Sequence, residues 1–245
     1  MERLRLADEA RSAQVDAEDS RLRAALFSSV THDLRTPLAS ITAAVTSLQD
    51  EQAAFTPGDR TDLLDTIRQE ADRLNRLVGN LLNLARMRAG ALKPEKEPAA
   101  IEEVIEAVLA RLQPMLAGRE VRLMMREDLG EIPMDVLQMD QVLTNLVENA
   151  CKYSPVGTPI TVVASSWHDS VEVRVADRGR GIPEDERQRV FEPFVRGDND
   201  PRAGSGLGLS IAQAIVVAHD GSMWIESTPG GGTTVAFRLP RGGES

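Results

Sequence analysis

The sequence predicts an α+β protein with two parts: a helical hairpin that forms a four-helix bundle with a second copy, and an α/β sandwich domain. Three observations support this fold class. Two heptad patterns of apolar residues flank a Pro-Gly turn near the start of the chain. A short segment rich in Pro, Gly and Lys follows, and strand patterns mix with helical ones beyond it. We expect a helical connector at residues 1–19, the hairpin at 20–90, a linker at 91–97 and the sandwich domain at 98–245.

Each helix of the expected hairpin carries apolar residues in alternating steps of four and three, which is the spacing of a coiled-coil seam. The first seam consists of Phe27, Thr31, Leu34, Leu38, Ile41, Val45 and Leu48. The second, interrupted by one glutamate, consists of Leu63, Ile67, Glu70, Leu74, Leu77, Leu81 and Leu84. Between them, Pro57 and Gly58 are expected to break the helix. Because two helices make only a thin core, we expect two copies to join as a homodimer.

Composition excludes several classes of protein. The net charge is −10 and no basic patch is present, so we expect no contact with nucleic acid. No run of about 18 apolar residues could span a bilayer, and the N-terminus lacks the apolar centre of a signal peptide. We therefore expect a cytoplasmic protein. The alternative is that a membrane sensor precedes these residues. In that case the chain would be the cytoplasmic part of an inner-membrane protein.

Residues 28–41, SSVTHDLRTPLASI, place a histidine beside an aspartate in the first expected helix. The heptad register puts His32, Asp33 and Thr36 on its outward side. Asp33 can accept a hydrogen bond from one ring nitrogen, which leaves the other nitrogen of His32 as a nucleophile. Pro37 lacks an amide proton and should loosen the helix here. An incidental surface histidine is the alternative, because the hairpin itself offers the imidazole nothing to attack.

The sandwich domain is expected to hold a mixed sheet that helices cover on one face, because several consecutive strands lack a helix between them. We expect helices near residues 100–117, 136–153 and 206–219. We expect strands near residues 119–126, 158–166, 170–177, 222–228 and 232–239.

The helix near 136–153 carries two asparagines one turn apart, Asn145 and Asn149, followed by Lys152 and Tyr153. An amide oxygen can ligate Mg²⁺, and a lysine can meet a phosphate. Paired asparagines are more often caps or surface residues. The lysine is the more informative residue, because lysine is rare in this chain.

Asp177 ends a strand and is followed by Gly179 and Gly181, in the stretch DRGRGIP. The glycines would let a ring approach the backbone. The carboxylate could accept a hydrogen bond from an exocyclic amine, such as that of adenine. An ordinary turn is the alternative.

The stretch FEPFVRGDNDPRAGSGLGLSI, residues 191–211, has the features of a lid. Phe191 and Phe194 could anchor the ends of a loop that is too polar to hold itself rigid. The glycines that follow lead into a helix, where free backbone amides can bind phosphate oxygens. A later glycine run that ends at Thr233 is equally well explained as a hairpin turn. The P-loop pattern Gly-x-x-x-x-Gly-Lys-[Ser/Thr] does not occur in the sequence.

Taken in order, THDLRTPL, NLVENACKYS, DRGRGIP, FEPFVRG and GSGLGLSI resemble the H, N, G1, F and G2 boxes of bacterial sensor histidine kinases. The resemblance covers roughly residues 20–240, as a HisKA-type dimerisation and phosphoacceptor domain followed by a HATPase catalytic domain. The segment HDLRTPLASI is similar to that of the Kdp-type potassium sensor kinases in particular. Many relatives have glutamate where this chain has Asp33.

The resemblance implies a protein-histidine kinase that uses ATP and Mg²⁺. His32 would take the γ-phosphoryl group and pass it to an aspartate on the receiver domain of a response regulator. Asp33 would assist His32 in this reaction. Thr36 would orient a water molecule that removes the phosphoryl group from the response regulator. Asn149 would ligate Mg²⁺. The implied ATP-binding residues are Asn145, Asn149, Lys152, Tyr153, Asp177, Gly179, Gly181, Ile182, Phe191, Arg196, Gly204, Ser205, Gly206, Leu207, Gly208 and Thr233.

Two other functions compete with this interpretation. The sandwich half also resembles the chaperone, topoisomerase and mismatch-repair ATPases, which would make the protein an ATP-gated clamp. A dimeric hairpin could also act as a non-catalytic scaffold. The histidine hairpin argues against the clamp, and the intact Asn149, Asp177 and lid glycines argue against the scaffold.

Overall fold

The computed structural model describes residues 34–50, 55–88, 92–126, 129–195 and 206–242. It forms two compact units, which divide between Leu81 and Leu82. This division falls inside the second hairpin helix, so the expected domain boundaries stay predictions. The expected connector at 1–19 lies outside the described residues. Among the helices within these ranges, none combines the length and the apolar character needed to cross a membrane.

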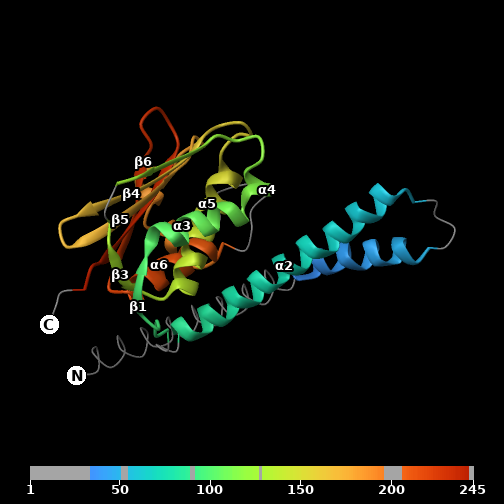
Figure 1. Cartoon of the computed structure of the whole chain (residues 1–245), viewed down its shortest axis with the longest axis horizontal. Helices are drawn as coiled ribbons and strands as arrows, with labels where there is room; N and C mark the ends of the chain where they lie inside the picture. Colours follow the sequence, from blue (N-terminus) through green and yellow to red (C-terminus); the bar gives the residue numbers. More distant parts are fainter. Residues whose placement is uncertain (1–33, 51–54, 89–91, 127–128, 196–205, 243–245) are drawn as a thin grey trace, which may run out of the picture. The chain divides into compact units, whose positions relative to one another are not determined.

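The first unit is a helical hairpin, as the heptad patterns predict (Figure 1). One helix covers residues 34–49, and the other, α2, covers Pro57–Arg88. Leu38 is 57% exposed, Leu64 58% and Val78 48%. Leu38 belongs to the predicted seam, whereas Leu64 and Val78 lie beside the seam of α2. Both helices therefore present apolar side chains that stay exposed in the single chain.

A capping box begins α2. The amide and the hydroxyl of Thr56 donate to Asp59 Oδ2 at 2.8 and 2.7 Å, and the amide of Asp59 donates to Thr56 Oγ at 3.2 Å. The expected interruption between the two helices is confirmed, but it lies before Pro57, because Pro57 and Gly58 belong to the first turn of α2. Proline suits the first helical position, where its missing amide proton would have no partner.

The second unit contains a five-stranded mixed sheet in the order β2-β4-β5-β7-β6. Only the β2–β4 pair is parallel. The strands of this sheet are β2 Val121–Met125, β4 Ile160–Trp167, β5 Ser170–Ala176, β6 Ser222–Ser227 and β7 Thr233–Pro240. The helices are α3 Ile101–Arg111, α4 Gln113–Leu116, α5 Val136–Tyr153 and α6 Gly208–Ala218. The predicted α/β sandwich is confirmed.

Two details of this domain differ from expectation. The helix expected at 100–117 divides at Leu112 into α3 and α4, because Pro114 lacks the amide proton that a continuous helix needs there. A two-stranded sheet of β1 Glu97–Ala100 and β3 Glu131–Met134 was not expected. Both strands contain proline, which lowers the strand signal.

The core lies between the helices and one face of the five-stranded sheet (Figure 1). Helix α5 contacts β4, β5 and α6, while α6 contacts β6 and β7. Alternate residues of β5, including Val173, point into this core, and Val173 pairs with Phe237 of β7. Phe237 is fully buried. This packing fixes α5 and α6, the helices that carry Asn145, Asn149, Lys152, Tyr153 and Gly208.

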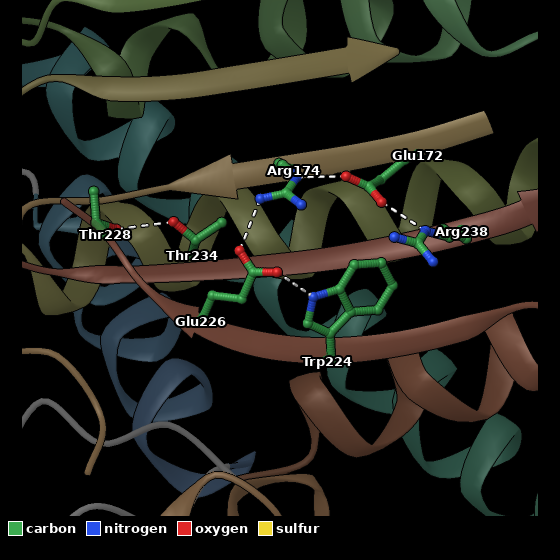
Figure 2. Close-up of polar contacts among 7 residues, drawn as sticks. All are labelled: Glu172, Arg174, Trp224, Glu226, Thr228, Thr234 and Arg238. Atoms are coloured by element: carbon green, nitrogen blue, oxygen red, sulfur yellow. Dashed lines mark hydrogen bonds and ion pairs between the residues drawn. The ribbon is translucent and has the colours of Figure 1, made fainter. Parts of the chain in front are cut away.

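The opposite face of the sheet carries a polar network, shown in Figure 2. The Glu172 carboxylate accepts from Arg174 Nε at 2.5 Å and from Arg238 Nε at 2.6 Å. Arg174 also donates to Glu226 at 2.7 Å. The Arg238 guanidinium lies over the rings of Trp167 and Trp224, at 4.6 and 4.7 Å from their centroids. These contacts join β5, β6 and β7 across the face that the core does not use.

Candidate active site

Helix α5 carries the first group of predicted site residues. Its N-cap residue, Asp135, accepts a hydrogen bond from the amide of Gln138 at 3.1 Å, which starts the helix. Asn145 is buried, and its Nδ2 donates to the carbonyl of Gly208 at 3.1 Å. Gly208 is the first residue of α6. The role of Asn145 in this structure is therefore to join the two helices of the site.

The last two turns of α5 carry Asn149, Lys152 and Tyr153, all half-buried. The Lys152 ammonium lies over the ring of Tyr153, 4.7 Å from its centroid. This cation–π contact holds the charge near the end of the helix. The arrangement places an amide oxygen and a cation one turn apart.

Asp177 follows β5 directly and is 6% exposed. Its Oδ1 accepts from the amide of Gly179 at 2.6 Å and from the amide of Thr233 at 3.1 Å. Burial raises the pKa of this carboxyl group, and the two amide hydrogen bonds oppose that rise. Within the described part of the chain, the hydrogen bonds to Asp177 both end on Oδ1. Oδ2 can therefore accept from a ligand.

Glycines are required around Asp177. A Cβ at Gly179 would lie 2.3 Å from the carbonyl oxygen of Tyr153, and one at Gly232 would lie 2.0 Å from the carbonyl oxygen of Asp177. Gly232 also has a φ of +114°, which other residues rarely adopt. The glycine run before Thr233 forms the hairpin turn between β6 and β7, and the amide of Thr233, which begins β7, bonds to Asp177.

The two described ends of the predicted lid are joined. The amide of Phe194 donates to the carbonyl of Gly206 at 3.0 Å. Gly206 has a φ of +69°, and a Cβ there would lie 2.9 Å from the carbonyl oxygen of Val195. Leu207, the fully buried N-cap residue of α6, makes no side-chain hydrogen bond to the first turn. Amides at this helix start can therefore bind an anion.

Phe191 precedes the loop of the predicted lid. It lines an apolar groove of about 380 Å³ along α6. The groove is lined by Leu92, Phe191, Pro193, Ser210, Gln213, Ala214, Val217 and Ala218. The carbonyl of Ile182 accepts from Arg187 at 3.3 Å, and Gly181 adopts a φ of +76°. These two residues continue the turn after Asp177.

His32, Asp33, Arg196, Gly204 and Ser205 lie outside the described residues. Thr36 is described, and its side chain is exposed on the helix at 34–49.

Sequence reasoning missed His219. It is 1% exposed, and its Nε2 accepts from the amide of Asp135 at 3.0 Å, so its Nδ1 carries the proton and donates to the Ile215 carbonyl at 2.8 Å. Burial lowers the pKa of His219. The residue thus links the end of α6 to the start of α5. A single histidine at position 219 gave no signal of this contact, which joins residues far apart in the sequence.

The donor atoms of this site fit a metal ion that takes most of its ligands from a phosphate-containing ligand and from water. The described residues hold no group of three or more His, Cys, Asp or Glu side chains that could bind a metal ion by themselves. Mg²⁺ usually takes one or two protein ligands and fills the rest of its shell with phosphate oxygens and water. The neutral amide oxygen of Asn149 suits that arrangement.

Two family models match the chain. The model for histidine kinase-, DNA gyrase B- and HSP90-like ATPases (HATPase_c) matches residues 134–243. The model for the His Kinase A phospho-acceptor domain (HisKA) matches residues 22–90. The chain belongs to the sensor histidine kinases. The HisKA match includes His32, and the HATPase_c match includes Asn149 and Asp177.

Relatives and solved structures agree with this family. The chain is 39% identical to sensor protein KdpD of Mycobacterium tuberculosis (strain CDC 1551 / Oshkosh), over 96% of this chain and 28% of that protein. It is 34% identical to sensor protein KdpD of Escherichia coli (strain K12), over 98% of this chain and 27% of that protein. The chain thus spans little more than a quarter of these relatives' length. The structure of full-length ShkA in complex with AMPPNP matches with a TM-score of 0.65 and 27% identity, over 89% of this chain and 46% of that chain.

Proposed function

We propose that this chain is the kinase part of a two-component sensor, in which ATP phosphorylates His32 and the phosphoryl group then passes to an aspartate of a response regulator. The observation that carries the proposal is the Asp177 site. A buried carboxylate is fixed through Oδ1 by two backbone amides, and its Oδ2 is left to accept from an adenine amino group. The AMPPNP bound in the ShkA structure supports an adenine nucleotide in this fold.

Each step has a residue to perform it. Asp177 would hold the adenine, and Lys152 with the amides at the start of α6 would hold the phosphates. A ring nitrogen of His32 would attack the γ-phosphorus, and the bond between that phosphorus and the β–γ bridging oxygen would break, so that ADP leaves. Mg²⁺, held by Asn149, would neutralise charge on the phosphates. Positioning and charge neutralisation supply most of the catalysis in phosphoryl transfer.

The proposal includes a homodimer in the cytoplasm. Leu38, Leu64 and Val78 are exposed apolar residues along the two hairpin helices, and a second hairpin would bury them. ATP and receiver domains are available in the cytoplasm, where this part of a sensor would act. The matches to KdpD and the segment HDLRTPLASI support a Kdp-type sensor kinase.

Trapping the phosphoryl group tests the proposal. ATP labelled at the γ-phosphate should give a protein adduct that is labile in acid and stable in base, which is the behaviour of phosphohistidine. The adduct should be absent from His32→Gln, while that variant still binds ATP. An ATP-gated clamp or a scaffold would give no such adduct, and a labelled His32→Gln would place the phosphoryl group on another residue.

Thr36 is assigned the water-orienting role in removing phosphate from the regulator. It lies four residues after His32 and is exposed on the helix. Thr36→Ala should keep autophosphorylation near the wild-type rate and slow loss of phosphate from the regulator by about tenfold or more. Equal decay with both proteins would leave Thr36 as a helix residue only.

A further inference from the structure

Arg119, between α4 and β2, caps the last turn of α5. Its Nη1 donates to Ser154 Oγ at 2.8 Å and to the carbonyl of Pro155 at 2.9 Å. Its Nη2 donates to the carbonyls of Cys151 and Ser154 at 2.7 and 3.1 Å. The last carbonyls of a helix have no partner inside the helix. One guanidinium therefore fixes the position of this turn by four hydrogen bonds.

The capped turn carries Lys152 and Tyr153, and Asn149 lies one turn earlier. The C-terminal end of a helix is the negative end of its dipole, which disfavours an anionic ligand nearby. The positive charge of Arg119 lies against these carbonyls and offsets their field. The turn is thereby made compatible with a phosphate-binding lysine.

The same turn packs tightly against Gly179, which lies beside Asp177. A Cβ at Gly179 would lie 2.3 Å from the carbonyl oxygen of Tyr153 and 2.9 Å from Asp177 Oδ1. The amide of Gly179 in turn donates to Asp177 Oδ1 at 2.6 Å. Gly179 is thus held between the end of α5 and the carboxylate. A displaced turn would displace Gly179 and, through its amide, the carboxylate.

We propose that Arg119 is a positioning residue of the nucleotide site, which acts through the last turn of α5 and Gly179 on Asp177 and so sets the preference for adenine over guanine nucleotides. The inference rests on the proposed function, in which Asp177 accepts from the adenine amino group. Guanine presents a carbonyl oxygen at the equivalent position, which a carboxylate repels. A misplaced carboxylate loses both the attraction to adenine and the repulsion of guanine.

The test compares ADP and GDP binding to the full chain by calorimetry in the presence of Mg²⁺, below the unfolding temperature of each variant. Arg119→Met should weaken ADP binding about tenfold and change GDP binding less, so that the ratio of the two dissociation constants falls. Arg119→Lys keeps the charge and a single donor group, so its ratio should be intermediate. Arg122→Met is the matched control, because Arg122 is an exposed arginine nearby that pairs with Glu120 at 2.8 Å. It should keep the wild-type ratio.

A purely structural role would lower the unfolding temperature of Arg119→Met and leave the ADP to GDP ratio unchanged, which would overturn the inference. If Arg119→Met does not fold, Arg119→Lys decides: a shifted ratio supports the inference, and a wild-type ratio overturns it. Asp177→Asn is measured alongside. Unchanged ADP binding in Asp177→Asn contradicts the proposed function itself. Weakened ADP binding there, with wild-type behaviour in Arg119→Met, contradicts only the role of Arg119.

Discussion

The helical hairpin and the sheet domain differ in how completely each buries its apolar side chains. In the hairpin, Leu38 and Leu64 are 57% and 58% exposed. In the sheet domain, Phe237 and Ile215 are fully buried within a large core, although single surface residues such as Leu137 are exposed. Among the hairpin residues whose burial the structure describes, Ala44 is the one buried hydrophobic residue. The sheet domain closes its core within one chain, whereas the hairpin leaves part of its apolar surface for another helix pair. We infer that the hairpin depends on a second copy and that the sheet domain does not.

The largest effect is expected when the exposed face of the hairpin is charged. Leu64→Glu should weaken dimerisation by about 100-fold or more, because the bundle would have to bury a carboxylate without a partner. Sedimentation at several protein concentrations measures this. Gln69→Glu adds the same charge at an exposed polar position of α2 and should leave the dimer unchanged. A dimer that tolerates Leu64→Glu would show that this face is not the interface.

The sheet domain should be sensitive to its own core instead. Phe237→Ala should lower the free energy of unfolding of this domain by about 3–5 kcal/mol, since it opens a cavity at a fully buried site. Both tryptophans of the chain, Trp167 and Trp224, lie on its sheet, so their fluorescence during urea unfolding reports this domain alone. Leu64→Ala should leave that transition unchanged. A matching shift in Leu64→Ala would show that the two regions unfold as one.

A smaller effect is expected from the polar face of the sheet. Burial alone would raise the pKa of Glu172, but hydrogen bonds from Arg174 and Arg238 outweigh it and hold that pKa below its ordinary value. Glu172→Gln should cost about 2 kcal/mol at neutral pH. Because the pKa is lowered in the folded protein, this stability is present above the ordinary pKa of 4.5 and is lost as the pH falls through the folded value. The difference in the free energy of unfolding between wild type and Glu172→Gln should therefore become smaller in acid. A difference that stays constant with pH would exclude an ionised Glu172 in the network.

The smallest effect concerns His219, which faces Lys96, Asp135 and Asp220. Burial lowers its pKa from the ordinary value of 6.5, so the folded protein favours the neutral ring. Its contribution to stability is full above pH 6.5 and is lost as the pH falls through the lowered value. The free energy of unfolding of the sheet domain should therefore fall as the pH drops through that window. His219→Gln should show a flatter dependence of this free energy on pH. If wild type and His219→Gln showed the same dependence of unfolding free energy on pH, protonation of His219 would not be coupled to unfolding.

Much of this fold could be predicted, because its elements have strong local patterns. The helix expected at 136–153 has those bounds in the structure. The strands of the five-stranded sheet were each expected within about two residues of their ends. The short β1–β3 pair was missed, since both strands contain proline and their pairing joins distant residues.

The candidate site divides in the same way. The motifs predict Asn149, Lys152 and Asp177 from residue types at fixed spacing, and the roles of these residues stay predictions. Arg119 and His219 were not predicted. Arg119 bonds to the Cys151 carbonyl 32 positions away, and His219 bonds to the Asp135 amide 84 positions away; such contacts leave no local pattern.

The proposed function assigns phosphorylation to the hairpin and ATP binding to the sheet domain, and one paired measurement separates the two. ATP affinity and phosphohistidine formation are measured on the same samples of His32→Gln and Asn149→Asp. We predict that His32→Gln binds ATP like the wild type and forms no phosphohistidine. Asn149→Asp should impair use of Mg²⁺·ATP, because a charged ligand changes the metal's coordination and repels phosphate. The ATP affinity of each variant is measured on its own, so it does not depend on whether the two variants can form mixed dimers. Loss of ATP binding in His32→Gln, or unchanged phosphohistidine formation in Asn149→Asp, would show that the two functions are not divided between these regions.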